Sequence, residues 1–319
     1  MNNKLTIAIP TFNRQGKAQE LFKKINKKHN YHEFDLIIAD NSSEPPIAID
    51  GSNKYNKIFS RKFNIGFTAN ILRLFEECET EWLIILGDDD DINDTFLNDI
   101  ELSITGCELD DDEVCAIKFK SSLDKHQEII KIQGFDQFCT YNSTPERMGS
   151  TIFLSTWLFR VSSLRNYIRY GYMHSGLQIP HVIPVLKALN DGHAILYSDL
   201  EPVLYRTADE NSRWDPGFTF VMGFFSTFTF PEFIKNNQLL NFTKLMGGQK
   251  LKSMIGFTIK IYYTFPEGNL KYLLRFYSMV GVKQFTAVII FKLIKPFLKN
   301  KSISLKLKKI IGITSNDRM

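Results

Sequence analysis

Four consecutive aspartates follow a short apolar run in the first third of the chain. Residues 82–91 read Trp-Leu-Ile-Ile-Leu-Gly-Asp-Asp-Asp-Asp, so that Gly87 separates a stretch typical of a buried strand from the acids Asp88 to Asp91. Adjacent carboxylates repel one another, and a divalent cation held by their oxygens relieves that repulsion. The segment therefore favours metal binding, with a solvated acidic loop as the alternative.

Two further polar clusters follow apolar runs upstream. The run 5–9 leads into Pro10-Thr11-Phe12-Asn13-Arg14, and the run 34–39 ends at Asp40-Asn41-Ser42-Ser43. An arginine, amides and a carboxylate near a metal-binding loop are the groups that a nucleotide site needs. The turn at 10–16 has no Gly-x-Gly and the sequence contains no P-loop motif, which disfavours a dinucleotide-binding fold and P-loop chemistry.

Alternating strands and helices must position these clusters. Strands are predicted at 5–9, 34–39, 57–60 and 82–86, with a helix after the first and another after the third. The inward faces of the two helices are predicted to be Ala18, Leu21, Phe22 and Ile25, then Ile71, Leu74, Phe75 and Cys78. This alternation indicates an α/β fold with a parallel sheet, whose ligands bind at the carboxyl ends of the strands.

Length and composition limit the class of protein. The 319 residues, 44% of them hydrophobic, can form one large or two modest domains. The four cysteines form no Cys-x-x-Cys pair, which disfavours structural zinc and favours reduced thiols in a cytoplasmic protein. We expect no signal peptide and no transmembrane segment, since the longest uncharged stretch, 216–231, is shorter than the ~20 residues of a spanning helix.

The basic residues are concentrated near the C-terminus. Residues 283–316 contain eight lysines and no acid, mixed with large apolar side chains, whereas the rest of the chain carries a net charge of −4. A basic amphipathic stretch of this kind favours an anionic membrane surface, with a solvated helix packed on the catalytic domain as the alternative. Nucleic acid is not expected as a partner, because the remainder is acidic and shows no recognised nucleic-acid motif.

Four motifs in this order resemble the GT-A nucleotide-sugar domain of family 2 glycosyltransferases. They are residues 5–14, 40–43, 64–66 with Asn70, and 86–90. The resemblance is strongest to the bacterial branch that builds O-antigen and capsular polysaccharides, including abequosyltransferase-like enzymes. It implies a Rossmann-like α/β domain with a mixed sheet at 1–215, divided into a nucleotide-sugar part (1–100) and an acceptor part (101–215). A mainly helical, basic region is expected at 216–319.

The resemblance also assigns roles to individual residues. It implies that Asp40 reads the base, and that Asp89, once Gly87 is aligned with the first aspartate of the family's metal motif, binds Mg²⁺ or Mn²⁺. Asp91 then becomes a surface acid. The implied donor pocket consists of Pro10, Thr11, Asn13, Arg14, Asp40, Asn41, Asn64, Gly66, Asn70, Asp88, Asp90 and Arg206.

The general base is the residue on which the chain departs from the family. The family usually carries a Glu-Asp pair at the start of a helix that ends in glycine. The matching stretch here ends at Gly192 and places Pro180-His181 where the pair would stand. Histidine can serve as a base near neutral pH, and a structural role is equally open. Asp209 and Glu210 are the competing carboxylates.

The implied activity is that of a metal-dependent, inverting glycosyltransferase. It would move a sugar from a nucleotide-sugar donor to a glycan or undecaprenyl-linked oligosaccharide at the inner face of the cytoplasmic membrane. One alternative is a sugar nucleotidyltransferase, whose glycine-rich, basic signature is missing from 11–16. The other is a non-catalytic scaffold, if the base has been lost at 180–181.

Overall fold

The computed structural model describes the greater part of residues 4–204. The described residues are 4–27, 34–49, 55–110, 113–121, 128–142, 144, 147, 150–173 and 179–204. All of them belong to one of the two compact units into which the chain divides. Arg206, Asp209, Glu210 and the basic region 216–319 lie outside them, so the domain boundary near residue 215 stays a prediction.

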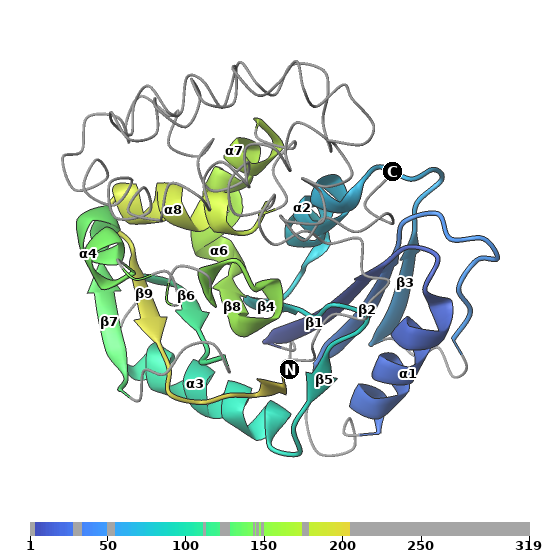
Figure 1. The fold of residues 1–319 in the computed structure, drawn as a ribbon, viewed down its shortest axis with the longest axis horizontal. Coiled ribbons are helices and arrows are strands. Elements are labelled where there is room, and N and C mark those ends of the chain that lie inside the picture. Colours follow the sequence, from blue (N-terminus) through green and yellow to red (C-terminus); the bar gives the residue numbers. More distant parts are fainter. Residues whose placement is uncertain are drawn as a thin grey trace, which may run out of the picture. The chain divides into compact units, whose positions relative to one another are not determined.

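Eight strands form one mixed sheet, in the order β3-β2-β1-β4-β8-β6-β9-β7 (Figure 1). The strands are β1 (Leu5–Thr11), β2 (Asp35–Asp40), β3 (Asn56–Ser60), β4 (Trp82–Ile85), β6 (Val114–Lys118), β7 (Ile130–Gln133), β8 (Trp157–Arg160) and β9 (Ala194–Tyr197). Strands β1 to β4 are parallel, β8 is antiparallel to both β4 and β6, and β7 is antiparallel to β9. The predicted α/β fold with a mixed central sheet is confirmed.

Helices cover both faces of this sheet. They are α1 (Gln15–Asn26), α2 (Phe67–Glu77), α3 (Phe96–Asp110), α4 (Gly134–Tyr141), α6 (Val161–Leu164), α7 (Ile168–Met173) and α8 (Val182–Asn190), with short 3₁₀ turns η1 (Leu154–Thr156) and η2 (Arg165–Tyr167). The apolar faces of α1 and α3 share one buried cluster with Leu5, Ile7 and Ile9 of β1. On the other face α2 and α8 both pack on α7 (Figure 1).

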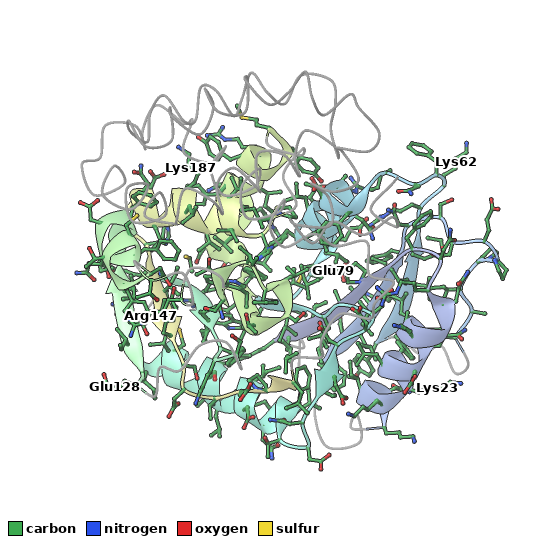
Figure 2. The ribbon with its side chains drawn as sticks, in the orientation of Figure 1. Lys23, Lys62, Glu79, Glu128, Arg147 and Lys187 are labelled. Atoms are coloured by element: carbon green, nitrogen blue, oxygen red, sulfur yellow. The ribbon has the colours of Figure 1, made fainter. Side chains whose placement is uncertain are left out.

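The predicted inward faces of the first two helices are confirmed. The buried residues of α1 are Ala18, Leu21, Phe22 and Ile25, and those of α2 include Ile71, Leu74 and Phe75, with Cys78 buried just beyond its end. Charged side chains such as Lys23 on α1 and Lys62 after β3 are exposed (Figure 2). Local hydrophobic periodicity was sufficient here because each helix buries one stripe against the sheet.

The sheet brings the ends of distant segments to a common edge. Because β1, β2 and β4 are parallel, the loops that follow them leave from the same edge, where ligands bind in folds of this class. A second, two-stranded sheet pairs β5 (Asp91–Ile92), which begins at the fourth aspartate, with β10 (Val203–Leu204). Within the described ranges, no helix has the length and apolar character to span a bilayer, and the four cysteines are buried and form no disulfide bond.

Candidate functional site

The loops after β1 and β4 meet through four side chains. Thr11, the last residue of β1, donates a hydrogen bond from its hydroxyl to Asp88 Oδ2 at 2.7 Å. Arg14 spans two acids, with Nη1 2.8 Å from Asp88 Oδ1 and Nη2 2.6 Å from Asp89 Oδ2. The structure therefore brings together the predicted donor residues of the first motif and the predicted metal residue of the fourth.

The acidic loop is tightly folded on itself. The Gly87 amide donates to Asp90 Oδ2 at 2.5 Å, and the Asp90 amide donates to the Gly87 carbonyl at 3.0 Å. The hydroxyl of Ser155 also donates to Asp90 Oδ2. Burial raises the pKa of Asp90 to about 6, although the hydrogen bonds from Ser155 and Gly87 favour its charged form.

Asp88 and Asp89 differ in their surroundings. Asp88 is buried, and its burial raises the pKa of its carboxyl, against the opposing effects of Thr11 and Arg14. The side chain of Asp89 is 44% exposed and is paired with Arg14. Of Asp88 and Asp89, Asp89 is therefore the acid that is more open to an incoming ligand, and its role as a metal ligand stays a prediction.

The Asp40 carboxylate shapes the loop that follows β2. Asp40 is 1% exposed, and the backbone amides of Ser43 and Ile47 lie 2.9 and 3.5 Å from its two oxygens. The adjoining turn is fastened to the first motif, since the Asn13 amide donates to the Ser43 hydroxyl and the Glu44 amide donates to Asn13 Oδ1. Asn13 adopts φ 54°, a left-handed conformation that asparagine tolerates well.

The third motif is joined to the second by amide side chains. Asn41 donates to Asn64 Oδ1 at 2.8 Å and accepts from the Ile65 amide at 3.0 Å. Asn70 anchors the start of α2 by donating to the Ala39 carbonyl at 3.0 Å. Gly66, with φ +83°, turns the chain into α2 in a conformation that L side chains rarely adopt. The predicted pocket residues of these motifs thus lie together and fix one another's loops.

The donor set at this edge fits a divalent cation that arrives with a nucleotide. Within the part of the chain that the structure describes, no three His, Cys, Asp or Glu side chains converge as a metal cage. Mg²⁺ is commonly held by one or two carboxylates together with substrate phosphates and water, so a cage is not required. Asp89 supplies an accessible oxygen ligand of the kind that Mg²⁺ and Mn²⁺ prefer.

His181 lies in a different environment from the one a general base needs. It stands at the start of α8, is 1% exposed, and packs edge-on against Phe159 with 6.2 Å between ring centroids. Neither ring nitrogen makes a hydrogen bond of good geometry among the described residues. Burial lowers the pKa of His181 to about 3; the backbone of Thr151 opposes this shift, and the charge of Lys118 adds to it. These are the properties of a core histidine, although α8 is followed, after Asp191, by Gly192 in the left-handed conformation (φ +98°).

Two residues at the acidic loop have contacts that no sequence motif indicates. Ser155 reaches Asp90 from η1, 65 residues along the chain. Asp91, predicted to be a surface acid, forms an ion pair with Lys24 of α1 at 2.5 Å and has a side chain 23% exposed. Both contacts depend on how α1, β4 and β8 are placed around the sheet, so no local pattern could have revealed them.

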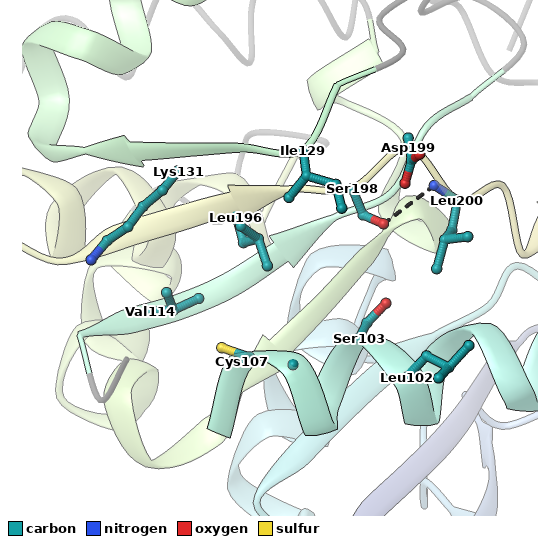
Figure 3. A pocket seen from close by; sticks show the side chains of 11 residues that line it. Leu102, Ser103, Cys107, Val114, Ile129, Lys131, Leu196, Ser198, Asp199 and Leu200 are labelled. Carbon is teal, nitrogen blue, oxygen red and sulfur yellow. Dashed lines mark hydrogen bonds between the residues drawn. The ribbon is translucent and has the colours of Figure 1, made fainter. Parts of the chain in front are cut away.

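A separate apolar pocket of about 490 Å³ lies between α3 and strands β6, β7 and β9 (Figure 3). Its lining includes Leu102 and Cys107 of α3, Val114 of β6 and Leu196 of β9. Its lining residues include none of the predicted site residues. The chemistry of the acidic loop is therefore distinct from this pocket.

Comparison with known proteins connects this geometry to a family. The family described as glycosyl transferase family 2 matches residues 6–102, which span β1 to the first half of α3. No curated protein matches the chain.

Solved structures with the same fold include two that are bound to nucleotide sugars. S. aureus TarS 1-349 in complex with UDP-GlcNAc has a TM-score of 0.55 at 13% identity, covering 97% of this chain and 90% of that chain. The mannosyltransferase PcManGT from Pyrobaculum calidifontis, in complex with GDP-Man and Mn²⁺, has a TM-score of 0.51 at 11% identity, covering 97% of this chain and 84% of that chain. At these identities the likeness shows the fold.

Proposed function

We propose that this chain, a glycosyltransferase with a family 2 domain at residues 6–102, transfers a sugar from a nucleoside diphosphate to a hydroxyl acceptor with a divalent cation. The observation that carries the proposal is the meeting of Thr11, Arg14, Asp88 and Asp89 at the carboxyl ends of β1 and β4. They combine a positively charged arginine, an accessible carboxylate and a loop held in one conformation, which are the features that binding of a sugar nucleotide requires. A sugar nucleotidyltransferase and a non-catalytic scaffold are the alternatives that the experiment below separates.

Arg14 and Asp89 would receive the diphosphate end of the donor. Asp89 would hold Mg²⁺ or Mn²⁺, which when bound supplies positive charge to the departing diphosphate. The Arg14 guanidinium, 40% exposed and shared between Asp88 and Asp89, is placed to donate hydrogen bonds to phosphate oxygens. Thr11 keeps the Asp88 carboxylate fixed, so that ligand binding needs little rearrangement of the loop.

The nucleoside would lie along the loops after β2 and β3. Asp40 holds the loop 40–47 from inside, and the Asn41 and Asn64 side chains tie it to the turn before α2. We assign Asp40 to the support of the loop that lines the base, since the carboxylate is buried and faces the amides of Ser43 and Ile47. We assign Asn41 and Asn64 to the wall of the pocket, and Pro10 and Asn13 to the turn beneath it. Gly66 and Asn70 set the direction of α2 beside this wall.

Inversion requires a base that takes the proton of the acceptor hydroxyl. A neutral imidazole with a pKa of about 3 is too weak a base for this task at neutral pH, and the burial of His181 keeps it from an acceptor. We therefore assign the base to Asp209 or Glu210, and a contact with the diphosphate to Arg206. All three lie outside the described residues.

We further propose that the acceptor is a lipid-linked glycan and that the chain works at the inner face of the cytoplasmic membrane. The support is the segment 283–316, with eight lysines and no acid among large apolar side chains. Each lysine near an anionic headgroup region contributes on the order of 1 kcal/mol. Together with the resemblance to O-antigen and capsule enzymes, this charge pattern favours bacterial surface polysaccharide synthesis.

The activity can be tested with a panel of donors. The purified chain is incubated with Mn²⁺, UDP-, GDP-, CDP- or dTDP-sugars and a lipid extract of the cells that make it, and nucleoside diphosphate release is followed. We expect release from one donor class, dependent on both metal and extract. Formation of a sugar nucleotide from a sugar phosphate and a nucleoside triphosphate would instead indicate the nucleotidyltransferase. No turnover and no nucleotide binding would indicate a scaffold.

A further inference from the structure

One of the four aspartates, Asp90, is held by its own loop and by η1. Oδ2 of Asp90 accepts hydrogen bonds from the Gly87 amide and from the Ser155 hydroxyl, and the Gly87 amide also lies 3.4 Å from Ser155 Oγ. Ser155, Gly87 and Asp90 thus form a closed hydrogen-bonded group. It removes one carboxylate from the edge of the sheet and leaves Asp88 and Asp89 directed toward Thr11 and Arg14.

Ser155 is well anchored for holding this loop. It belongs to η1, which leads directly into β8, and β8 pairs with β4 through Leu158 and Ile84. The carbonyl of the next residue, Thr156, accepts a hydrogen bond of 2.8 Å from the amide of Phe119. This bond ties η1 to the end of β6. The serine therefore stands on a support fixed by two strands, at the end of β4 from which the acidic loop departs.

The hydroxyl counteracts a repulsion built into the sequence. Asp88, Asp89 and Asp90 are adjacent, so their like charges repel one another. The Ser155 hydroxyl donates to Asp90 Oδ2 and so favours the position in which this carboxyl group is held against Gly87 and η1. Without it, Gly87 alone among these contacts would hold the carboxylate.

We propose that Ser155 is a positioning residue of the donor site, which acts through Asp90 to fix the acidic loop with Asp88 and Asp89 facing the metal and the diphosphate. This inference rests on the proposed function. Ser155 itself comes from the part of the chain beyond the matched family region, so it couples the acceptor half of the domain to the donor loop. A preformed loop of this kind lowers the cost of ordering the site when the ligand binds.

The test uses three variants of the full chain. S155A removes the hydroxyl, S155T keeps it, and S162A makes the same small change at an exposed position on α6. Calorimetry measures the affinity of each protein for the nucleoside diphosphate that the wild type binds, with Mn²⁺ and without it. Thermal unfolding of each variant checks that the fold is kept, and S155C replaces S155A if the latter does not fold.

With Mn²⁺ present, we expect S155A to bind the nucleoside diphosphate about tenfold more weakly than the wild type, which corresponds to the loss of one hydrogen bond to a charged group. Without metal, we expect the affinity of S155A to fall by about twofold at most. S155T and S162A should bind like the wild type. Wild-type affinity in S155A, or equal losses in S155A and S155T, would overturn the inference. If the wild type binds no nucleoside diphosphate at all, the proposed function fails instead.

Discussion

At the scale of single residues, His181 shows how strongly surroundings decide chemistry. The same imidazole that would be a suitable base in water is held at a pKa of about 3 by burial against Phe159 and by the nearby charge of Lys118. It therefore stays neutral at every pH at which the chain is expected to work. Its contribution to the protein is one of packing at the start of α8.

This burial makes a prediction about stability in acid. The pKa of His181 is lower in the folded protein than in the unfolded chain. Its contribution to the free energy of unfolding is therefore fully present above the unfolded pKa of ~6.5 and is lost as the pH falls toward 3. Between pH 7.5 and pH 5 the loss amounts to about 2 kcal/mol. In urea unfolding, the free energy of unfolding of His181→Leu should change by about 2 kcal/mol less over this pH range than that of the wild type. Equal pH dependence in the two proteins would mean that the histidine is not buried in neutral form.

At the scale of elements, the turn that follows β4 depends on Gly87. A Cβ at this position would lie 3.0 Å from Asp90 Oδ2 and 3.2 Å from Asp89 Oδ1. Such contacts are tighter than side chains normally make, so the two carboxylates would have to shift. Glycine at this position therefore leaves space for the two carboxylates where they lie, and no left-handed backbone conformation is involved.

Gly87→Ala should weaken nucleoside diphosphate binding about tenfold or more, since displaced carboxylates lose their alignment with Arg14 and the metal. Gly16→Ala on α1 is the matched control, because nothing lies within 4 Å of its added Cβ. That control should keep its affinity, and its thermal unfolding should be close to that of the wild type. Isothermal titration of both variants with Mn²⁺ makes the comparison, and unchanged affinity in Gly87→Ala would show that the loop is more adaptable than its packing indicates.

The elements differ in how far the sequence could predict them. Strands β1 to β4 and helices α1 and α2 carry local hydrophobic patterns, so their order and inward faces follow from the chain alone. The insertion of β8 between β4 and β6 joins segments that lie far apart in sequence, and no local pattern indicates such a pairing. For the same reason the hydrogen bond from Ser155 to Asp90 was not predicted. The hydrogen bond that the Asp40 carboxylate accepts from its own loop depends on a loop conformation that residue types alone do not determine.

At the scale of the whole molecule, the charge is divided along the chain. The lysine-rich segment 283–316 is separated in sequence from the matched region 6–102, and the predicted membrane contact and the predicted donor site are thus assigned to different segments. The two activities should therefore be separable by truncation.

Deleting residues 283–319 should reduce binding to vesicles that contain anionic lipid, because the lost lysines supply most of the attraction. Added salt should weaken the binding of the full-length chain in the same assay, by screening those charges. Affinity for nucleoside diphosphate with Mn²⁺ should be kept in the truncated protein. Co-sedimentation with vesicles measures the first effect, and equal sedimentation of the two proteins would contradict the proposed membrane contact.

In the proposed function, Asp89 holds the metal that carries the donor's diphosphate. The most direct test of this assignment is Mn²⁺-dependent nucleoside diphosphate binding and release in Asp89→Asn, which keeps the size of the side chain and removes the charge. We predict that metal-dependent binding falls to the level measured without metal, and that sugar transfer is lost, while thermal unfolding is close to that of the wild type because Asp89 is 44% exposed. Near-normal turnover of Asp89→Asn at saturating Mn²⁺ would contradict the assignment.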